Sequence, residues 1–454
     1  MKKIFLVFFC LITNLIFAID ISNISNEEWS LNDLQVDMNS SGLAVAMWKK
    51  EMPTEDKSII EFALSDDFGR TWKEPQSLIE SMNVRYPKII INEAGEIICL
   101  WKKEHDDGKK NLEFAKSPDF GKTWTITQLD EINNFRSYEV KNINDSIFIL
   151  WKDSESVEIE KRGFYIKKSI DFGRTWKDIK HNVSNHSYQF NCFLHESGQS
   201  LITWQDYQYD CNTNTSQHLI YYSISDNFED DLSEADSFSI NTENTVEDIV
   251  QSFIDDNGNA IIIWSENQKE DSGYYSPVLH YSYSSDNGKS WSEAVILDKG
   301  VPSTDFYQTK LSVDPSGSMI FVWQAEAENY YEEGDFIKLA RSSDFGKTWS
   351  TPKIISDKSS NCSDPFIYSD SEGHILVTWD EADIEMLVSV KARYSPDFGI
   401  NWDPIAQLPD KNFHNGDSNG TNTKGNLILL WQQLSKRKVK CQRIISSDLG
   451  KSWE

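Results

Sequence analysis

Cysteine and histidine are scarce in this sequence, and neither occurs in a pattern that binds metal. Six cysteines and eight histidines occur among 454 residues. Five cysteines remain beyond the apolar N-terminal run, an odd and sparse set that is not typical of a disulfide scaffold. The sequence contains no CxxC or HExxH motif, no phosphate-binding loop and no dinucleotide fingerprint. We therefore expect no metal and no cofactor.

Basic residues are also few relative to acidic ones. The chain has 44 Lys and Arg against 72 Asp and Glu, which gives a formal net charge of −28. A nucleic-acid-binding protein needs a basic face that replaces counterions, and this sequence offers none, so we expect no nucleic-acid partner. Contact with an anionic membrane surface is disfavoured for the same reason, while strong acidity keeps a secreted protein soluble.

Long apolar runs are missing except at the N-terminus, which reads MKKIFLVFFCLITNLIFA. Two lysines, an apolar run and a small residue at Ala18 predict a bacterial-type signal peptide over residues 1–18. The run of roughly 15 residues is short for a spanning helix, which needs about 20. We expect a secreted, periplasmic or cell-surface protein, with residues 19–454 as one domain and no stable membrane insertion after cleavage.

The sequence does contain a short motif that recurs at intervals of about 50 residues, which is the signature of a repeat protein. The motif is Ser-x-Asp-x-Gly-x-x-Trp, and one double-length interval holds a decayed copy at Asp226. Seven good copies start at Ser65, Ser117, Ser169, Ser284, Ser342, Ser395 and Ser446.

A second series of short apolar runs, each ending in Trp, alternates with the motif. Apolar runs bounded by turn residues predict buried strands. A strand precedes each run and two follow it, with the motif between the last two, and no helical periodicity is present. Four strands per repeat predict one blade of a β-propeller. The eight runs end at Trp48, Trp101, Trp151, Trp204, Trp264, Trp323, Trp379 and Trp431.

The sequence therefore predicts an all-β propeller of eight four-stranded blades. The last motif ends at Trp453, so the eighth blade lacks its outer strand within the sequence. We expect the N-terminal segment 19–29 to supply that strand and to close the ring, because closure leaves no unpaired sheet edge.

The repeated motif itself is expected to be a folding device rather than a catalytic one. Its Asp carboxylate can accept hydrogen bonds within its own turn, its Ser can hold that carboxylate, and its Gly supplies a positive φ. Each turn carries one fixed carboxylate, which does not suit a metal. The structural carboxylates are Asp67, Asp119, Asp171, Asp286, Asp344, Asp397 and Asp448.

Ser-x-Asp-x-Gly-x-x-Trp resembles the Asp box, or bacterial neuraminidase repeat, of sialidase-like propellers. The resemblance covers nearly all of the mature chain, and it implies that the boxes lie on the face opposite the ligand site. It also implies a sialidase set of three arginines, a Tyr nucleophile paired with Glu, and an Asp acid/base. In this sequence "VRYP" offers Arg85, and Asp106 or Asp107 stands near the position of the acid/base.

The sequence departs from the sialidase pattern in two respects. Sialidases resemble six-bladed rings, and most arginines of this chain lie in boxes or on third strands, so three cannot be assembled. We therefore expect a protein that binds a glycan or a protein partner outside the cytoplasm, and more a binding protein than an enzyme. A divergent exo-α-sialidase or other glycoside hydrolase is the alternative, and an assembly factor is a third interpretation. The expected ligand contacts are Arg85, Tyr86, Arg136, Tyr138, Tyr188 and Tyr307.

Overall fold

The computed structural model describes most of the chain from residue 30 onward. The described residues are 30–51, 57–105, 109–131, 138–153, 163–181, 190–210, 215–227, 236–239, 245–269, 275–299, 308–325, 334–357, 361–370, 372–382, 388–411, 419–423, 425–435 and 438–453. Within them all regular structure is β-strand, and none of them forms a helix that could cross a membrane. The expected signal peptide at 1–18 lies outside the described residues.

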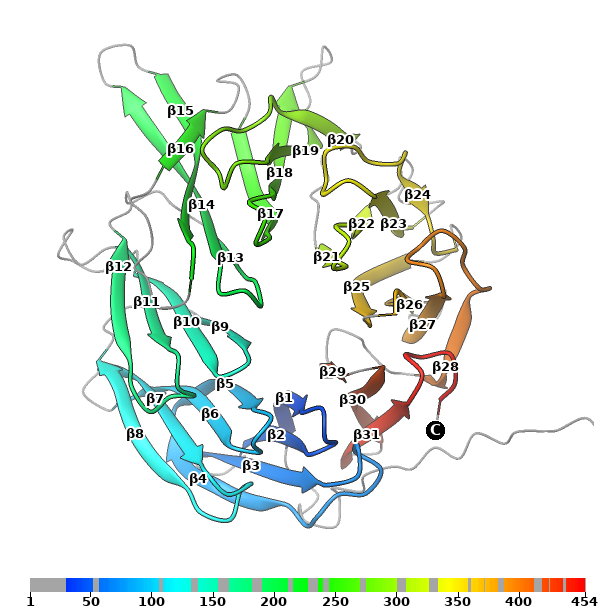
Figure 1. Ribbon diagram of the computed structural model, residues 1–454. Helices are drawn as coiled ribbons and strands as arrows, with labels where there is room; N and C mark the ends of the chain where they lie inside the picture. The colour runs from blue at the N-terminus through cyan, green and yellow to red at the C-terminus, as the bar shows by residue number, and fades with distance from the viewer. Residues whose placement is uncertain are drawn as a thin grey trace, which may run out of the picture.

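Eight antiparallel sheets surround a common axis (Figure 1). Blades 1 and 2 comprise β1 (Ser30–Met38), β2 (Ala44–Glu51), β3 (Lys57–Ser65) and β4 (Gln76–Met82), then β5 (Val84–Ile91), β6 (Ile97–Glu104), β7 (Lys110–Ser117) and β8 (Thr125–Glu131). Blades 3 and 4 comprise β9 (Tyr138–Ile143), β10 (Ser146–Asp153), β11 (Gly163–Ser169) and β12 (Lys177–His181), then β13 (Phe190–Leu194), β14 (Ser200–Asp210), β15 (Thr215–Ser225) and β16 (Asp236–Ser239).

The second half of the chain repeats this order. Blades 5 and 6 comprise β17 (Thr245–Ile254), β18 (Ala260–Lys269), β19 (Tyr275–Ser284) and β20 (Val295–Lys299), then β21 (Lys310–Val313), β22 (Met319–Ala325), β23 (Phe336–Ser342) and β24 (Lys353–Ile354). Blades 7 and 8 comprise β25 (Asn361–Ser369), β26 (Ile375–Ala382), β27 (Val388–Ser395) and β28 (Ala406–Lys411), then β29 (Asn419–Thr423), β30 (Asn426–Ser435) and β31 (Lys438–Ser446).

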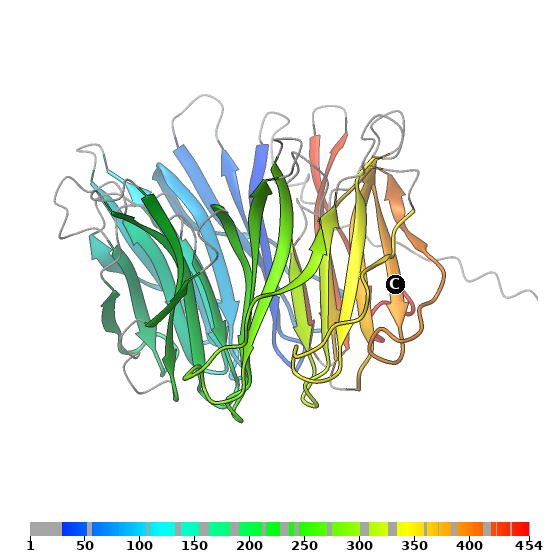
Figure 2. The same cartoon turned by 90° about the horizontal axis from the view of Figure 1, so that it is seen from above.

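Within each sheet the strands pair in chain order, from the inner strand at the axis to the outer strand at the rim. Among the described residues seven sheets have four strands, and the last, β29–β31, has three. Figure 2 shows the strands running between the two ends of the ring, with the β19–β20 and β23–β24 connections at its lower edge. The predicted all-β propeller with eight blades is confirmed.

The apolar runs that end in Trp form the second strand of every blade. Their indole rings fill the space between neighbouring sheets, and three of them donate to buried carboxylates: Trp48 Nε1 to Glu61 at 3.0 Å, Trp101 Nε1 to Glu113 at 3.0 Å and Trp264 Nε1 to Glu266 at 2.6 Å. The buried members are Trp48, Trp101, Trp151, Trp204, Trp264, Trp323 and Trp379.

Eight apolar clusters join each blade to the next around the ring. The first and last blades meet like the others, with Leu34 and Ala46 of blade 1 in one cluster with Ile428 and Leu430 of blade 8. Arg443 of β31 adds hydrogen bonds from its guanidinium to backbone carbonyls of the first box. Side-chain packing therefore connects the two ends of the described chain.

The expected closure by an N-terminal strand concerns residues 19–29, which lie outside the described residues. The first described strand, β1, is the inner strand of its own blade and pairs with β2. The outer position beside β31 has no strand among the described residues.

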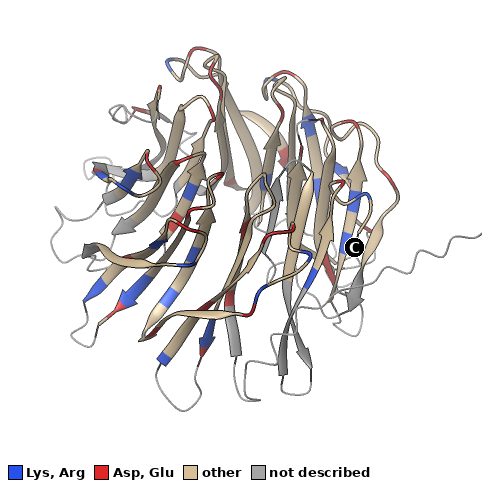
Figure 3. Ribbon diagram, turned by 60° about the horizontal axis from the view of Figure 1, so that its bottom comes forward, with Lys and Arg blue, Asp and Glu red and all other residues tan. Residues whose placement is uncertain are grey.

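Charges of both signs are interspersed on the strands rather than separated onto two faces (Figure 3). Some lysines are buried beside carboxylates, such as Lys50, whose Nζ lies 3.4 Å from Glu61 Oε1. The overall distribution of charge therefore does not explain why basic residues gather at any one place in this acidic protein.

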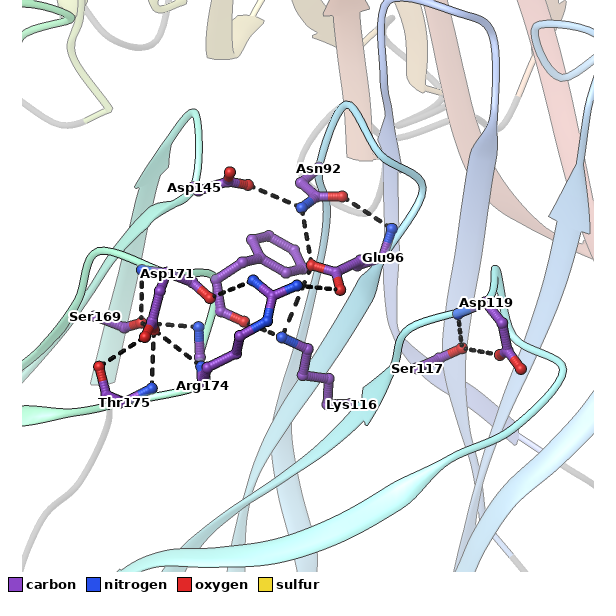
Figure 4. Close-up of polar contacts among 12 residues, drawn as sticks. Asn92, Glu96, Lys116, Ser117, Asp119, Asp145, Ser169, Asp171, Arg174 and Thr175 are labelled. Atoms are coloured by element: carbon purple, nitrogen blue, oxygen red, sulfur yellow. Dashed lines mark hydrogen bonds and ion pairs between the residues drawn. The ribbon is translucent and has the colours of Figure 1, made fainter.

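Each Asp box follows the third strand of its blade, and its hydrogen bonds match the expected device (Figure 4). In blade 3, Ser169 Oγ donates to Asp171 Oδ1 at 2.9 Å, and Thr175 donates from both its backbone N and its Oγ1 at 2.8 and 2.7 Å. Gly173 N donates to Ser169 Oγ at 2.8 Å. The Ser–Asp pair recurs in all seven boxes.

One feature of the box is not apparent from its sequence. The residue before the box Gly also has a positive φ, for example 51° at Phe172 and 59° at Phe345, although left-handed backbone is unfavourable for bulky residues. The cost is offset by packing and by a backbone hydrogen bond to the first hairpin of the same blade. Phe345 N donates to Gly317 O at 3.0 Å, and a Cβ on Gly317 would lie 2.3 Å from the Phe345 ring. Only Gly fits beneath that ring.

We predict that Asp344→Ala destabilises the protein by about 1–2 kcal/mol, because it removes three hydrogen bonds from Ser342 and Thr348. Urea unfolding measures this loss. The control is Ser343→Ala, at the exposed neighbouring position, which should leave the free energy of unfolding unchanged. Equal effects of the two substitutions would contradict the role given to the carboxylate.

The box carboxylates also predict a pH dependence. The hydroxyl and backbone N–H of Ser290, with the hydroxyl of Ser284, lower the pKa of Asp286 to about 2. A carboxyl with a depressed folded-state pKa stabilises the fold above its unfolded value of about 3.9, and this contribution disappears as the pH falls through the folded value. The stability difference between wild type and Asp286→Asn should be constant above about pH 5 and shrink between about pH 4 and pH 2. Urea unfolding across this range tests it.

Candidate functional site

The two ends of each blade carry different chemistry. The boxes lie at the end where the third strand stops, which we call the box end. Antiparallel pairing places the first residues of β5 opposite the last residues of β6, so Arg85 and Tyr86 lie at the other end of blade 2.

Tyr86 has an unusual backbone and an exposed ring. A bulge separates Arg85 from Lys88 in the pairing of β5 with β6, and Tyr86 within it has a φ of 56°. Its side chain is 41% exposed, and Lys102 Nζ lies 5.9 Å from the ring centroid. Burial of the ring therefore does not offset the left-handed backbone, in contrast to the buried Phe172 of the box.

The same bulge recurs on other inner strands with different residues. Asp33 in β1 and Asp364 in β25 occupy the equivalent position, with φ values of 55° and 52°. Short polar side chains such as Asp tolerate this region better than an aromatic residue does. Tyr86 thus departs from the residues that its own repeat uses at this position.

Tyr138 supports the bulge from the next blade. Its side chain is buried, and its hydroxyl donates to the backbone O of Tyr86 at 2.6 Å. Burial raises the pKa of Tyr138 well above its usual value, so the hydroxyl keeps its proton and remains a donor. The structure thus places Tyr138 beneath Tyr86, with its hydroxyl already engaged in the protein.

Basic residues lie close to Tyr86 along β5 and across from it on β6. Arg85 is exposed and lies directly opposite Lys102 in the β5–β6 pairing, while Lys103 lies opposite Val84. Like charges directly opposite each other destabilise a sheet. Lys103 Nζ has a carboxylate partner, Glu113 Oε1, at 3.7 Å. We call Arg85, Tyr86 and Lys102 the blade 2 corner.

Lysines of three blades also lie near the axis. Burial lowers the pKa of Lys88, and the nearby Lys141 lowers it further, while Asp33 and Glu139 oppose the shift. Lys310, from blade 6, has a pKa lowered by burial and by the same Lys141. Glu139 opposes both shifts, so Lys88 and Lys310 share one electrostatic environment that contains a carboxylate as well as cations.

The remaining sequence-predicted contacts cannot be placed. Arg136, Tyr188, Tyr307, Asp106 and Asp107 lie outside the described residues. Among the arginines that the structure describes, Arg85 alone belongs to an inner strand. The others hold backbone at the box end, as Arg341 Nε does by donating to Phe398 O at 2.9 Å.

Cysteines and metal ligands add nothing to the corner. Cys99, Cys192 and Cys362 are buried thiols outside any disulfide, and burial raises the pKa of Cys192 and of Cys362 to about 12. The described residues contain no group of three or more His, Cys, Asp or Glu that could hold a metal ion.

Sequence reasoning missed Lys88 and Lys102. Lys88 lies three residues after Arg85 on β5, and Lys102 lies opposite Arg85 on β6. The bulge between Arg85 and Lys88 sets how these residues lie, and the residue pattern does not encode it.

We predict that Tyr86→Gly leaves the free energy of unfolding within about 1 kcal/mol of wild type. Glycine adopts a positive φ without strain, which offsets its larger unfolded-state entropy, and the lost ring is exposed. Phe172→Gly is the matched comparison at a second left-handed position, where the ring is buried, and should cost about 3 kcal/mol or more. Urea unfolding distinguishes the two, and a large loss at Tyr86 would show that its ring is structural.

Comparison with known proteins gives one family match and several distant structural likenesses. Residues 248–454 match the BNR repeat-like domain. No curated protein matches the chain. Similar solved structures include a polysaccharide lyase of family PL25, an ulvan lyase bound to -[GlcA(1-4)Rha3S]-, with 10% identity over 93% of this chain and 95% of that one and a TM-score of 0.46.

Two further structures are a propeller domain and a sialidase. The β-propeller domain of the trilobed protease from Pyrococcus furiosus has 14% identity over 87% of this chain and 97% of that one, with a TM-score of 0.43. The intramolecular trans-sialidase from Ruminococcus gnavus, in complex with oseltamivir carboxylate, has 15% identity over 95% and 97%, with a TM-score of 0.32.

The family match lies in the second half of the chain, and the first half carries boxes of the same sequence and the same hydrogen bonds. The resemblance deduced from the boxes is confirmed for residues 248–454, which match the BNR repeat-like domain.

Proposed function

We propose that this protein binds an anionic glycan outside the cytoplasm, with the acidic group of the glycan held at the blade 2 corner. The observation that carries the proposal is Tyr86, an exposed aromatic ring kept on left-handed backbone. Strained backbone that packing does not explain is concentrated at functional sites. An aromatic face suits the C–H face of a sugar ring.

The charges of the corner support an anionic ligand. Arg85 and Lys102 lie opposite each other on adjacent strands of a chain whose net charge is −28. An arginine fork can grip a carboxylate through two hydrogen bonds, and Arg85 is exposed to solvent at the corner. Lys88, two residues after Tyr86 on β5, adds a cation near the corner, with Asp33 and Glu139 as the nearby carboxylates.

The extracytoplasmic location rests on the N-terminal sequence. Residues 1–18 combine two lysines, an apolar run and a terminal small residue, which is the pattern of a cleaved signal peptide. Glycans are abundant outside cells, so the location and the ligand class agree.

We predict that Arg85→Ala and Tyr86→Ala each weaken binding to acidic glycans at least about tenfold, which corresponds to about 1.4 kcal/mol. A glycan array identifies the ligand, and titration calorimetry with the purified mature chain measures the affinity. The control is Arg70→Ala, which removes an exposed arginine from the first box at the opposite end of the blade and should bind like wild type.

Two outcomes would replace this proposal. Turnover of a fluorogenic sialoside that Arg85→Ala abolishes would make the corner part of a hydrolase site. Capture of one stoichiometric protein partner, with no binding on the glycan array, would favour the assembly factor. Binding that survives both substitutions would exclude the corner as the ligand site.

A further inference from the structure

A cavity of about 490 Å³ lies among the inner strands of blades 3 to 6, which stand next to one another around the axis (Figure 1). Its volume falls within the range of small-ligand pockets, roughly 300–1,000 Å³. The lining comes from β9, β13, β17 and β21, from the turns that follow the last three, and from the box of blade 6. We call this cavity the inner-strand pocket.

The inner-strand pocket lies at the box end of the ring, because the first hairpin of each blade meets a box there. Asn287 N of the blade 5 box donates to Gly258 O at 2.9 Å, as Phe345 N of the blade 6 box does to Gly317 O at 3.0 Å. The pocket therefore lies at the opposite end from the blade 2 corner, and it shares no residue with that corner.

The floor of the pocket is apolar and incompletely covered. The rings of Phe193 and Phe253 pack with their centroids 4.8 Å apart. Phe253 is buried, but Phe193 and Val313 are only partly buried. Val313 ends β21 as Ile91 ends β5, and Ile91 is buried in its blade interface. The pocket thus leaves apolar surface that an apolar part of a ligand can cover.

Acidic residues line this pocket and basic ones do not. Four carboxylates belong to the lining, which contains no Lys or Arg: Glu196, Asp255, Asp256 and Asp314. None of the four forms an ion pair with another described residue. His195, also in the lining, accepts from Ser197 N at 3.2 Å through Nδ1, which is the arrangement of a neutral ring. A cleft with charge of one sign over apolar walls concentrates its field, so the pocket favours a cation.

The lysines of the lining strands do not neutralise these carboxylates. Lys310, at the start of β21, places its Nζ 4.9 Å from the ring centroid of Phe366 in blade 7, on the side of blade 6 away from the pocket. Lys141 of β9 pairs with Glu139, with 3.7 Å between Nζ and Oε2. Both lysines therefore have partners outside the lining.

The turns of blades 5 and 6 do not require a negative charge. Asp314 Oδ1 accepts from Ser316 N at 2.8 Å and from Ser318 N at 2.9 Å, and Asp255 makes the equivalent pair of bonds. In blade 1 the amide oxygen of Asn39 accepts two backbone N–H groups in the same way. The turn needs an acceptor oxygen, and Asn supplies one without adding charge.

The rim of the pocket carries two exposed carboxylates. Glu196 and Asp256 occupy the same position in the turns of blades 4 and 5, and both are exposed. An ammonium group carries three N–H donors and no acceptor, so it can donate to carboxylates of more than one blade. Ammonium donors match a rim of carboxylates better than hydroxyl groups do, since the charges are opposite.

We propose that the inner-strand pocket binds an organic cation that consists of an ammonium group on an apolar body. The ammonium lies at the rim beside Glu196 and Asp256, and the apolar body covers Phe193 and Val313 on the floor. This inference goes beyond the acidic glycan proposed for the blade 2 corner and does not depend on it.

The probe is 2-phenylethylammonium, and 2-phenylethanol, which has the same ring and chain length but no charge, is the control ligand. Titration calorimetry of the mature chain and crystals soaked in each compound measure affinity and position. We expect the ammonium to occupy the pocket and to bind at least about tenfold more tightly than the alcohol at low salt. Equal affinities, density away from the pocket, or no binding at about 20 mM would overturn the proposal.

Glu196→Gln combined with Asp256→Asn is the decisive variant, because both side chains are exposed and both replacements keep the size of the side chain. It should weaken binding of the ammonium at least about tenfold and leave binding of the alcohol unchanged. Glu93→Gln neutralises the same turn position in blade 2, outside the pocket, and should bind like wild type.

Arg85→Ala separates this proposal from the one for the blade 2 corner, since it should leave ammonium binding unchanged. Thermal melting of all variants checks that they fold. An equal loss of binding in Glu93→Gln would show that the overall charge of the protein, and not the pocket, attracts the cation, and the proposal would then be wrong.

Discussion

No blade of this protein can bury its apolar side chains alone, and the rest of the structure depends on that constraint. Each sheet has two apolar faces, and each face is covered only by the next blade. The eight clusters between blades bury the second-strand tryptophans, whose individual removal from a core typically costs about 3–5 kcal/mol. The last interface, between blades 8 and 1, is as necessary as the others because an uncovered blade face would expose a large apolar surface.

The boxes have a different role, because each forms the tight turn that follows the third strand of its blade. Each box satisfies its own backbone through one Ser and one Asp, and it places two consecutive residues on left-handed backbone. The hydrogen bond from Phe345 N to Gly317 O connects this turn to the first hairpin of the blade. Both turns at the box end are therefore fixed locally, which leaves the opposite end of each blade free to vary in sequence.

Departures from the repeat mark the places where the fold does not explain a residue. Tyr86 stands where two other inner strands, β1 and β25, have Asp33 and Asp364 on the same left-handed backbone. This departure carries an energetic cost, through strained backbone at Tyr86. A repeat protein thus offers an internal comparison for what is structural, and the blade 2 corner is a place where one blade differs from the others.

The amino-acid sequence alone determined the fold class, the eight blades, the position of every box and the burial of the Trp strands. These features follow from local patterns, since the hydrogen bonds of a box join residues two to four positions apart. The tertiary structure alone decided the left-handed backbone of Tyr86, the support from Tyr138 and the contact of Arg174 with Glu96. The last two contacts join residues 52 and 78 positions apart, and they exist only because packing sets the distance between neighbouring blades.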